Sequence, residues 1–217
     1  MNEDHPLFRQ DIRWEDAQAE LESLDLSDGL PMVPPTLDRF DAMISGRGAS
    51  DQSFGHLMPL MGELTLEAVA YNCILAGCRP EELPVVLTAA EACTDDGFNL
   101  LGVLSTTGTP TVAICVHGSL VTDLHMNAGS NALGPGNRAN ACIGRAVSLI
   151  MRNVAGAKPG VADMATMGQP GKYTFCFAES AHPGFPSLPE RRGFGANESC
   201  MTVLGVSGTA EVLPISG

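Results

Sequence analysis

Apolar residues recur at helical spacing in several stretches of the chain. In residues 12–26 the positions are Trp14, Ala17, Leu21 and Leu24, and residues three or four apart share one face of a helix. Similar spacing predicts helices over about 36–46, 63–76, 80–93 and 137–154. Residues 48–62 between them are predicted to form a loop. Gly77 follows the 63–76 stretch, where a glycine commonly ends a helix.

Other apolar stretches are too short for helices of ordinary length and are predicted to be strands. They cover residues 100–106, 111–117, 172–179 and 199–206. Helices come mostly before strands, which favours a sheet covered by helices over regular βαβ alternation. The sequence therefore predicts an α/β (or α+β) fold with a mixed sheet of about four or more strands. Residues 1–217 are predicted to form one domain, with 1–27 as an acidic N-terminal helical extension.

Charge and cysteine content narrow the classes of function. The chain has 217 residues and a formal net charge of −13, so we expect no binding to nucleic acid. No apolar run approaches the roughly 20 residues that span a bilayer, so we expect no membrane partner. The seven cysteines form no CxxC pair, and no signal peptide is recognised. Reduced thiols in a cytoplasmic protein are the simplest interpretation. The apolar content and the Met-rich residues 56–61 lead us to expect a homo-oligomer.

A loop rich in Gly and Asn leads into the predicted helix over 137–154 and is the strongest candidate site. Backbone N–H groups at a helix N-terminus favour an anion, and a guanidinium in the first turn can bind a carboxylate through two hydrogen bonds. The candidate substrate-binding residues are Asn127, Asn131, Gly134, Gly136, Arg138 and Asn140. The alternative is an ordered connection in which Asn and Gly adopt left-handed turn conformations.

Arg138, Arg145 and Arg152 are spaced by seven residues and share one helical face. Arg145 is a further candidate binding residue, and it could instead pair with an acidic residue of a neighbouring element. Arg152 is interpreted as part of a solvated stripe. Ser105 and Thr106 follow a predicted strand and could line the same cleft as the Gly-rich loop.

Three side chains are candidates for catalysis. Cys176 lies on the predicted strand over 172–179 and would be a nucleophile if a cation lowered its pKa; a buried structural thiol is the alternative. Alternation along that strand is expected to leave Cys176 on the face more open to a cleft. Glu179 could act as a general base or pair with Arg138 or Arg145, because a carboxylate ending an apolar strand needs a partner. His125 is the candidate for proton transfer near neutral pH.

Four segments together resemble a family of bacterial proteins. They are DGLPMVPPT (28–36), AGCRPEELPVVL (76–87), NAGSNALGPGNRANACIGRA (127–146) and MGQPGKYTFCFAE (167–179). The family is marked by DGLPxVPPT and GNALGPGxRAN signatures, and the resemblance runs over roughly residues 28–206. It implies an association with small selenoproteins, or their cysteine counterparts, that carry a Sec/Cys-Gly-Ser-Cys motif. It implies no defined reaction.

The leading hypothesis is an enzyme for a small anionic, carboxylate-like metabolite. A lyase, a hydrolase or a thiol-dependent enzyme without an organic cofactor would fit the candidate residues. One alternative is a non-catalytic subunit that binds a redox or catalytic partner protein. Another is a metal-dependent enzyme that draws ligands from His117, His125, Cys176 or Glu179.

Overall fold

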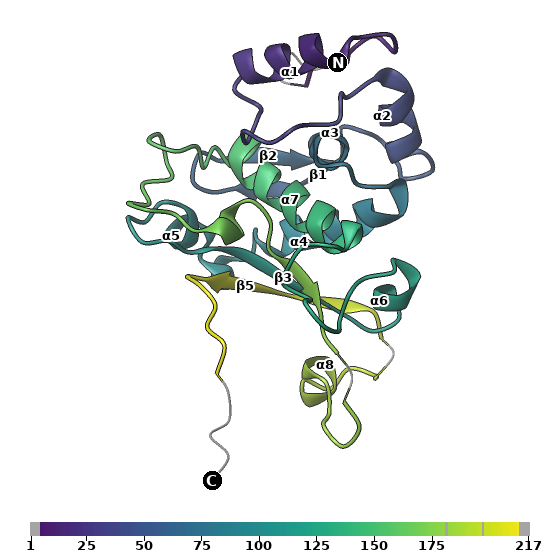
Figure 1. Cartoon of the computed structure of the whole chain (residues 1–217), viewed down its shortest axis with the longest axis vertical. Helices are drawn as coiled ribbons and strands as arrows, with labels where there is room; N and C mark the ends of the chain where they lie inside the picture. The colour runs from purple at the N-terminus through teal and green to yellow at the C-terminus, as the bar shows by residue number, and fades with distance from the viewer. Residues whose placement is uncertain (1–4, 181, 197, 213–217) are drawn as a thin grey trace.

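The computed structural model describes residues 5–180, 182–196 and 198–212. Figure 1 shows helices stacked above a small sheet, with one short helix below it. The α-helices are α1 (Trp14–Ser23), α2 (Leu37–Ile44), α3 (Leu66–Ala76), α4 (Leu83–Ala92), α5 (Leu100–Leu104), α6 (Leu120–Asp123), α7 (Arg138–Asn153) and α8 (Leu188–Arg191). The strands are β1 (Ser53–Leu57), β2 (Gly62–Thr65), β3 (Thr111–His117), β4 (Cys176–Ala178) and β5 (Cys200–Val206). Short 3₁₀ turns cover Pro80–Glu82, Asp96–Phe98 and Pro170–Lys172.

The strands form two separate sheets. β1 and β2 are an antiparallel pair, and the other sheet has the order β4-β3-β5. In that sheet β3 runs parallel to β4 and antiparallel to β5. Mixed helices and strands confirm the broad α+β prediction. The prediction of four or more strands in one sheet is wrong, because the largest sheet among the described residues has three strands.

The fourth predicted strand, over residues 100–106, is absent because most of that stretch forms the helix α5. Asn99 precedes it in a left-handed conformation, and its side chain accepts a hydrogen bond from Gly102 N. A side chain that accepts from the first turn of a helix is an N-cap. The pattern of a short apolar run does not distinguish a helix from a strand. Here the hydrogen bond of the Asn99 cap stabilises the helix.

Three further predictions need correction. Residues 48–62 are not simply a loop, because they contain β1, and β2 takes the residues 63–65 that were predicted to begin a helix. Thr65 is the actual N-cap of α3, and its side chain accepts from Ala68 N. The strand predicted over 172–179 is reduced to Cys176–Ala178, because Pro170 begins a 3₁₀ turn whose last residue is Lys172.

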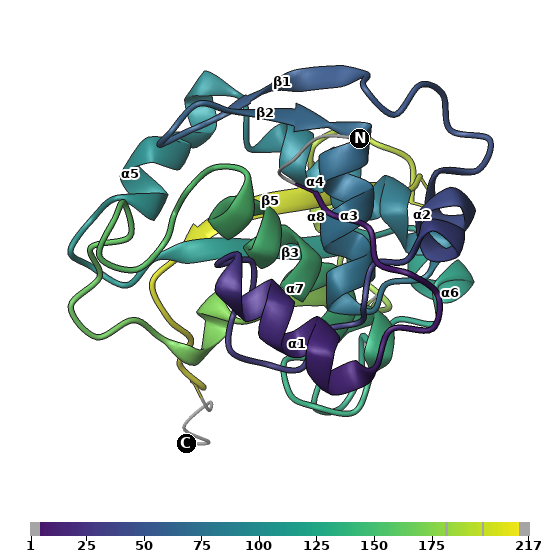
Figure 2. The ribbon, with the colours of Figure 1, turned by 90° about the horizontal axis from the view of Figure 1, so that it is seen from above.

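α7 lies at the centre of the molecule and connects its layers. It packs on β3 and β4 on one side and on α3 on the other, and α4 lies beside it. Seen from above in Figure 2, α3 and α7 run side by side over the sheet, and the β1–β2 pair lies at the periphery. Val112, Ile114 and Val116 of β3 join the buried core formed with these helices. No helix among the described residues is both long and apolar enough to cross a membrane.

Candidate functional site

The Gly-rich loop before α7 forms hydrogen bonds mainly with itself. Asn140 Oδ1 accepts from Asn127 N at 3.0 Å, and Asn140 Nδ2 donates to Asn127 O at 2.9 Å. Asn131 has a positive φ of 60°, and its Nδ2 donates to Pro135 O at 2.8 Å. Gly134 N donates to Asn131 O, and Gly136 also has a positive φ. The asparagine groups expected to meet a ligand are therefore largely used to shape the loop.

Arg138 pairs with Glu82, which is buried just before α4. The guanidinium makes two hydrogen bonds to the Glu82 carboxylate and a longer one to Gly77 O at 3.3 Å. Glu82 Oε2 also accepts from Arg79 N at 2.8 Å. The hydrogen bond with Glu82 raises the pKa of Arg138 above its ordinary value. The guanidinium expected to bind a substrate anion is thus already bound to a carboxylate of the chain.

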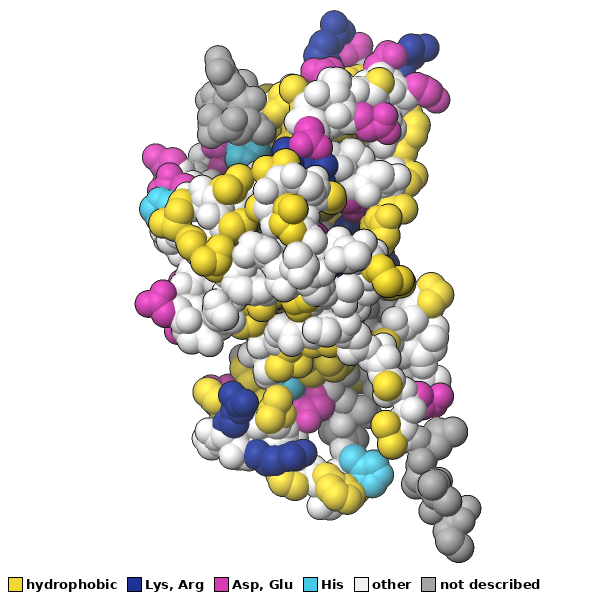
Figure 3. All heavy atoms as spheres, turned by 90° about the vertical axis from the view of Figure 1, so that its left-hand side faces the viewer, with side chains coloured by type: hydrophobic (Ala, Val, Ile, Leu, Met, Phe, Trp, Pro, Cys, Tyr) yellow, Lys and Arg dark blue, Asp and Glu magenta, His cyan; other side chains and the backbone are white. Residues whose placement is uncertain are grey.

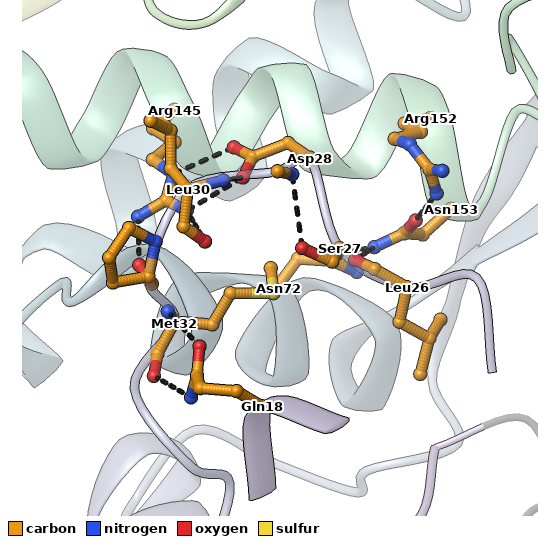
Figure 4. Close-up of polar contacts among 12 residues, drawn as sticks. Gln18, Leu26, Ser27, Asp28, Leu30, Met32, Asn72, Arg145, Arg152 and Asn153 are labelled. Carbon is orange, nitrogen blue, oxygen red and sulfur yellow. Dashed lines mark hydrogen bonds and ion pairs between the residues drawn. The ribbon is translucent and has the colours of Figure 1, made fainter. Parts of the chain in front are cut away.

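Arg145 and Arg152 bind the segment that follows α1, as Figure 4 shows for the Asp28 turn. Arg145 Nε and Nη2 each donate to an Asp28 carboxylate oxygen at 2.8 Å, and Nη1 donates to Pro31 O at 2.9 Å. Arg152 forms an ion pair with Asp25. Its interpretation as a solvated residue is wrong, because its side chain is only 18% exposed. All three arginines of the stripe hold segments that precede α7.

Cys176 is buried on the face of the sheet toward the helices, where it belongs to the apolar core. The expectation that it faces an open cleft is wrong. Phe177, its neighbour on the opposite face, is the partly exposed residue of β4. Burial raises the pKa of the Cys176 thiol well above its ordinary value, which disfavours the nucleophilic thiolate.

The remaining predicted residues do not gather in one place. His125 is exposed with a positive φ of 52°, and its carbonyl accepts from Asn137 Nδ2 at 2.8 Å. Ser105 Oγ donates to Leu101 O at 2.7 Å, within the end of α5. Thr106 Oγ1 accepts from Gly108 N at 3.1 Å. Ser105 and Thr106 therefore contribute to local turn structure.

Glu179 contacts His117, which lies 62 residues away in the sequence and contacts Thr202 in turn. His117 Nδ1 lies 2.7 Å from Glu179 Oε2, and His117 Nε2 lies 2.9 Å from Thr202 Oγ1. Glu179 also accepts from the backbone N–H of Leu188 at 2.9 Å. We name these three side chains the Glu179–His117–Thr202 relay. The predicted ion pair of Glu179 with Arg138 or Arg145 is wrong, because both arginines bind other carboxylates.

The strand register explains how the relay forms. His117 is the last residue of β3, Glu179 immediately follows β4, and Thr202 on β5 pairs with Cys115. Cys115, His117 and Thr202 therefore share the face of the sheet away from α7. The His117 side chain is 1% exposed and that of Glu179 25%, while Thr202 is half-buried. The enclosed histidine thus connects a carboxylate with the hydroxyl of a half-buried threonine.

Two thiols lie near the relay and remain protonated at neutral pH. Burial and the nearby Glu179 carboxylate raise the pKa of Cys115 to about 12. Burial, and the carboxylates of Glu198 and Glu179, also raise the pKa of Cys200.

At the height of α8, in the lower part of Figure 3, acidic and basic side chains and histidine lie among hydrophobic ones. Within the described residues no three His, Cys, Asp or Glu side chains form a group that could hold a metal ion.

Two cavities lie away from the Gly-rich loop that was predicted to be the site. One of about 510 Å³ lies between the second half of α7, the start of β3 and the loop before β4, and another of about 520 Å³ lies between the β1–β2 pair and the end of α7. The Gly-rich loop and Arg138 line neither of these two cavities. The loop that the sequence marks as the strongest candidate site therefore coincides with neither cavity.

Comparison with protein-family models, with curated proteins and with solved structures gives no match. The function must therefore be argued from the geometry of the chain itself.

Proposed function

We propose that the chain is a small-molecule hydrolase in which Thr202 is the nucleophile, His117 the general base and Glu179 the residue that orients the histidine. The observation that carries this proposal is the pair of hydrogen bonds at 2.7 and 2.9 Å that joins the three side chains. A nucleophile within hydrogen-bond reach of a base, with the base oriented by a third group, is the common pattern of nucleophilic catalysis.

The hydrogen bonds define the protonation pattern that the reaction needs. The Glu179 carboxylate already accepts from Leu188 N and accepts the Nδ1 proton of His117. Nε2 is then the unprotonated nitrogen and accepts from the Thr202 hydroxyl. A neutral histidine in this tautomer is ready to remove the hydroxyl proton.

In the proposed reaction Thr202 Oγ1 attacks the acyl carbon of an ester or amide while His117 Nε2 takes the hydroxyl proton. Glu179 stabilises the imidazolium that forms. The same proton then passes to the leaving group as its bond to the acyl carbon breaks. Water, deprotonated by His117, releases the acid and restores Thr202.

The surroundings of Glu179 support a carboxylate-bearing substrate. α8 begins at Leu188, whose backbone contacts Glu179, and Arg191 and Arg192 come within the next four positions. Both arginines are exposed, and the side chain of Arg192 has no hydrogen bond or ion pair with any residue that the structure describes. A guanidinium without a partner is suited to bind a carboxylate.

The test has a part that needs no known substrate. A fluorophosphonate should phosphonylate the Thr202 hydroxyl, and peptide mapping by mass spectrometry would locate the adduct. A paired assay would compare p-nitrophenyl acetate with the p-nitrophenyl monoester of succinic acid. We expect faster hydrolysis of the succinate ester, because it carries the carboxylate.

Matched variants separate catalysis from folding. Thr202→Val should lower kcat by roughly 10³-fold or more, while Thr202→Ser should retain activity. His117→Gln and Glu179→Gln should each lose labelling. Thr174→Val is the control, because that hydroxyl donates to Ala141 O at 2.8 Å, away from the relay. Labelling that is absent, or that persists in Thr202→Val, contradicts the proposal and leaves the relay as a structural link between strands.

A further inference from the structure

The cavity of about 510 Å³ lies at the opposite end of β3 from the relay. Thr111, the first residue of β3, lines this cavity, and His117 is the last residue of the strand. Six residues of extended strand cover about 20 Å, so a molecule in the cavity does not touch the relay. We call this space the α7–β3 cavity. Its volume is within the range of roughly 300–1,000 Å³ typical of small-molecule sites.

The deep wall of the α7–β3 cavity is apolar. Leu104 of α5, Val112 of β3, and Leu149 and Met151 of α7 are buried residues that line it. Three different elements contribute these side chains, so the wall is fixed by the packing of the core. An apolar molecule gains free energy from contact with such a wall, because both surfaces leave water.

Each charged side chain that lines the cavity already has a partner of opposite charge. Lys172 Nζ lies 2.7 and 2.6 Å from the two carboxylate oxygens of Asp163. Asp28 is bound by Arg145, and Arg152 pairs with Asp25. A charged ligand would enter without a free counter-charge, and burying an unpaired charge is costly. The cavity therefore favours an uncharged ligand.

Three hydroxyl groups on the lining remain available. Ser148 Oγ of α7, Thr111 Oγ1 of β3 and Tyr173 Oη have no hydrogen-bond partner among residues 5–180, 182–196 and 198–212. By contrast, the amide nitrogen of Gln169 is occupied, because Nε2 donates to Thr109 O at 2.6 Å and to Val206 O at 2.9 Å. The cavity thus offers hydrogen bonds from hydroxyl groups to a ligand that is otherwise apolar.

The entrance is also apolar. Met167 and Tyr173 line the cavity and are 90% and 49% exposed. Val161 and Met164, on the same loop, are 65% and 51% exposed. Exposed apolar side chains grouped around a cavity mark a binding site more often than isolated ones do, and methionine adapts to ligands of different shape.

We infer that the α7–β3 cavity binds an uncharged, largely apolar small molecule that carries one hydrogen-bonding group. This site is separate from the relay and needs no part of the proposed hydrolysis. Its ligand class also differs, since the relay is proposed to act on a carboxylate and the cavity excludes one.

Two closely related fluorescent probes test this inference. N-phenyl-1-naphthylamine is uncharged, and 8-anilinonaphthalene-1-sulfonate has the same aromatic body with an added sulfonate. Titration of the full chain should show saturable binding of the uncharged probe at one site, at least about tenfold tighter than binding of the sulfonate. Equal or tighter binding of the sulfonate, or no saturable binding of the uncharged probe, would overturn the inference.

Variants locate the bound probe. Ser148→Trp should fill the cavity and weaken binding at least about tenfold, whereas Ser45→Trp, at the exposed end of α2, should leave it unchanged. Tyr173→Ala, at a residue that is 49% exposed, should weaken binding severalfold and serves if Ser148→Trp does not fold. Thr202→Val should bind the probe as the natural chain does. Unchanged binding in folded Ser148→Trp, or in Tyr173→Ala when that variant is used in its place, would place the probe elsewhere.

Discussion

The first half of α7 and the ends of the strands in the three-stranded sheet both bring polar side chains together, with different results. In α7, Arg138 is hydrogen-bonded to Glu82, and Asn140 forms hydrogen bonds with the loop that precedes the helix. At the strand ends, Glu179 and His117 form a chain of hydrogen bonds that ends at the hydroxyl of the half-buried residue Thr202. The first group joins elements of the fold, whereas the second is the site of the proposed reaction. Polar density alone does not separate a structural clamp from a catalytic site.

The variant with the largest expected effect tests whether Arg138 stabilises the fold through its ion pair with Glu82. Arg138→Met leaves Glu82, whose side chain is 1% exposed, without its counter-charge. We expect a loss of about 3 kcal/mol in the free energy of unfolding, at the low end for breaking a buried pair, because Arg79 N still donates to the carboxylate. Urea denaturation followed by circular dichroism measures it.

Arg13→Met is the matched control for that experiment. Arg13 pairs with Asp16 where their side chains are 73% and 53% exposed, so its loss should leave the free energy of unfolding nearly unchanged. Equal stability of Arg138→Met and the natural chain would mean that the Arg138–Glu82 pair does not stabilise the fold, and the comparison between the two regions would fail.

An intermediate effect is expected at Asn140, which is 4% exposed. Asn140→Ala removes its hydrogen bonds to both backbone groups of Asn127 and leaves those groups without a partner. We expect a loss of about 2 kcal/mol, measured by thermal and urea unfolding. Asn131→Gly, which keeps the left-handed conformation at an exposed residue, should cost less than about 1 kcal/mol. If the two variants are alike, Asn140 does not organise the loop.

The smallest effect concerns pH. Hydrogen bonds from Lys158 and Arg152 lower the pKa of Asp25 below its ordinary value of 3.8. A lowered pKa in the folded state means that the ionised carboxylate stabilises the fold above pH 3.8 and that this contribution is lost as pH falls through the folded-state pKa. Because the Asp25 side chain is 59% exposed, we expect less than about 1 kcal/mol.

Comparison of the natural chain with Asp25→Asn measures that contribution. The stability difference between them should be present at pH 7 and should shrink toward zero at pH values below about 4. A difference that is the same at pH 7 and pH 2.5 would show that the Asp25 charge is not its source.

The fold could be predicted best where local signals were strong. The helix expected over 137–154 is α7, and Asn137 caps it by accepting from Asn140 N. Gly77 ends α3 in the left-handed conformation, as predicted. The apolar pattern of residues 100–106 could not show whether they form a helix or a strand, because the helix depends on the capping conformation of Asn99. The number of strands in the sheet was wrong for that reason.

The candidate site was less predictable because it depends on contacts between distant residues. Glu179 was recognised as a carboxylate that needs a partner, but its partner His117 is 62 residues away and Thr202 lies 85 residues from His117. Nothing near Thr202 in the sequence distinguishes its hydroxyl from those of other strand threonines. Only the register of β3 against β5 brings it to the histidine.

The ion pairs of Arg145 and Arg152 have a consequence for how the chain is made. Their partners Asp28 and Asp25 precede them by 117 and 127 residues. At a synthesis rate of roughly 5–20 residues per second, these aspartates leave the ribosome about 6 to 25 s before the arginines that bind them. The segment that carries Asp25 and Asp28 is therefore made well before its partners on α7, and a ribosome that stalls before residue 145 exposes that segment without either arginine.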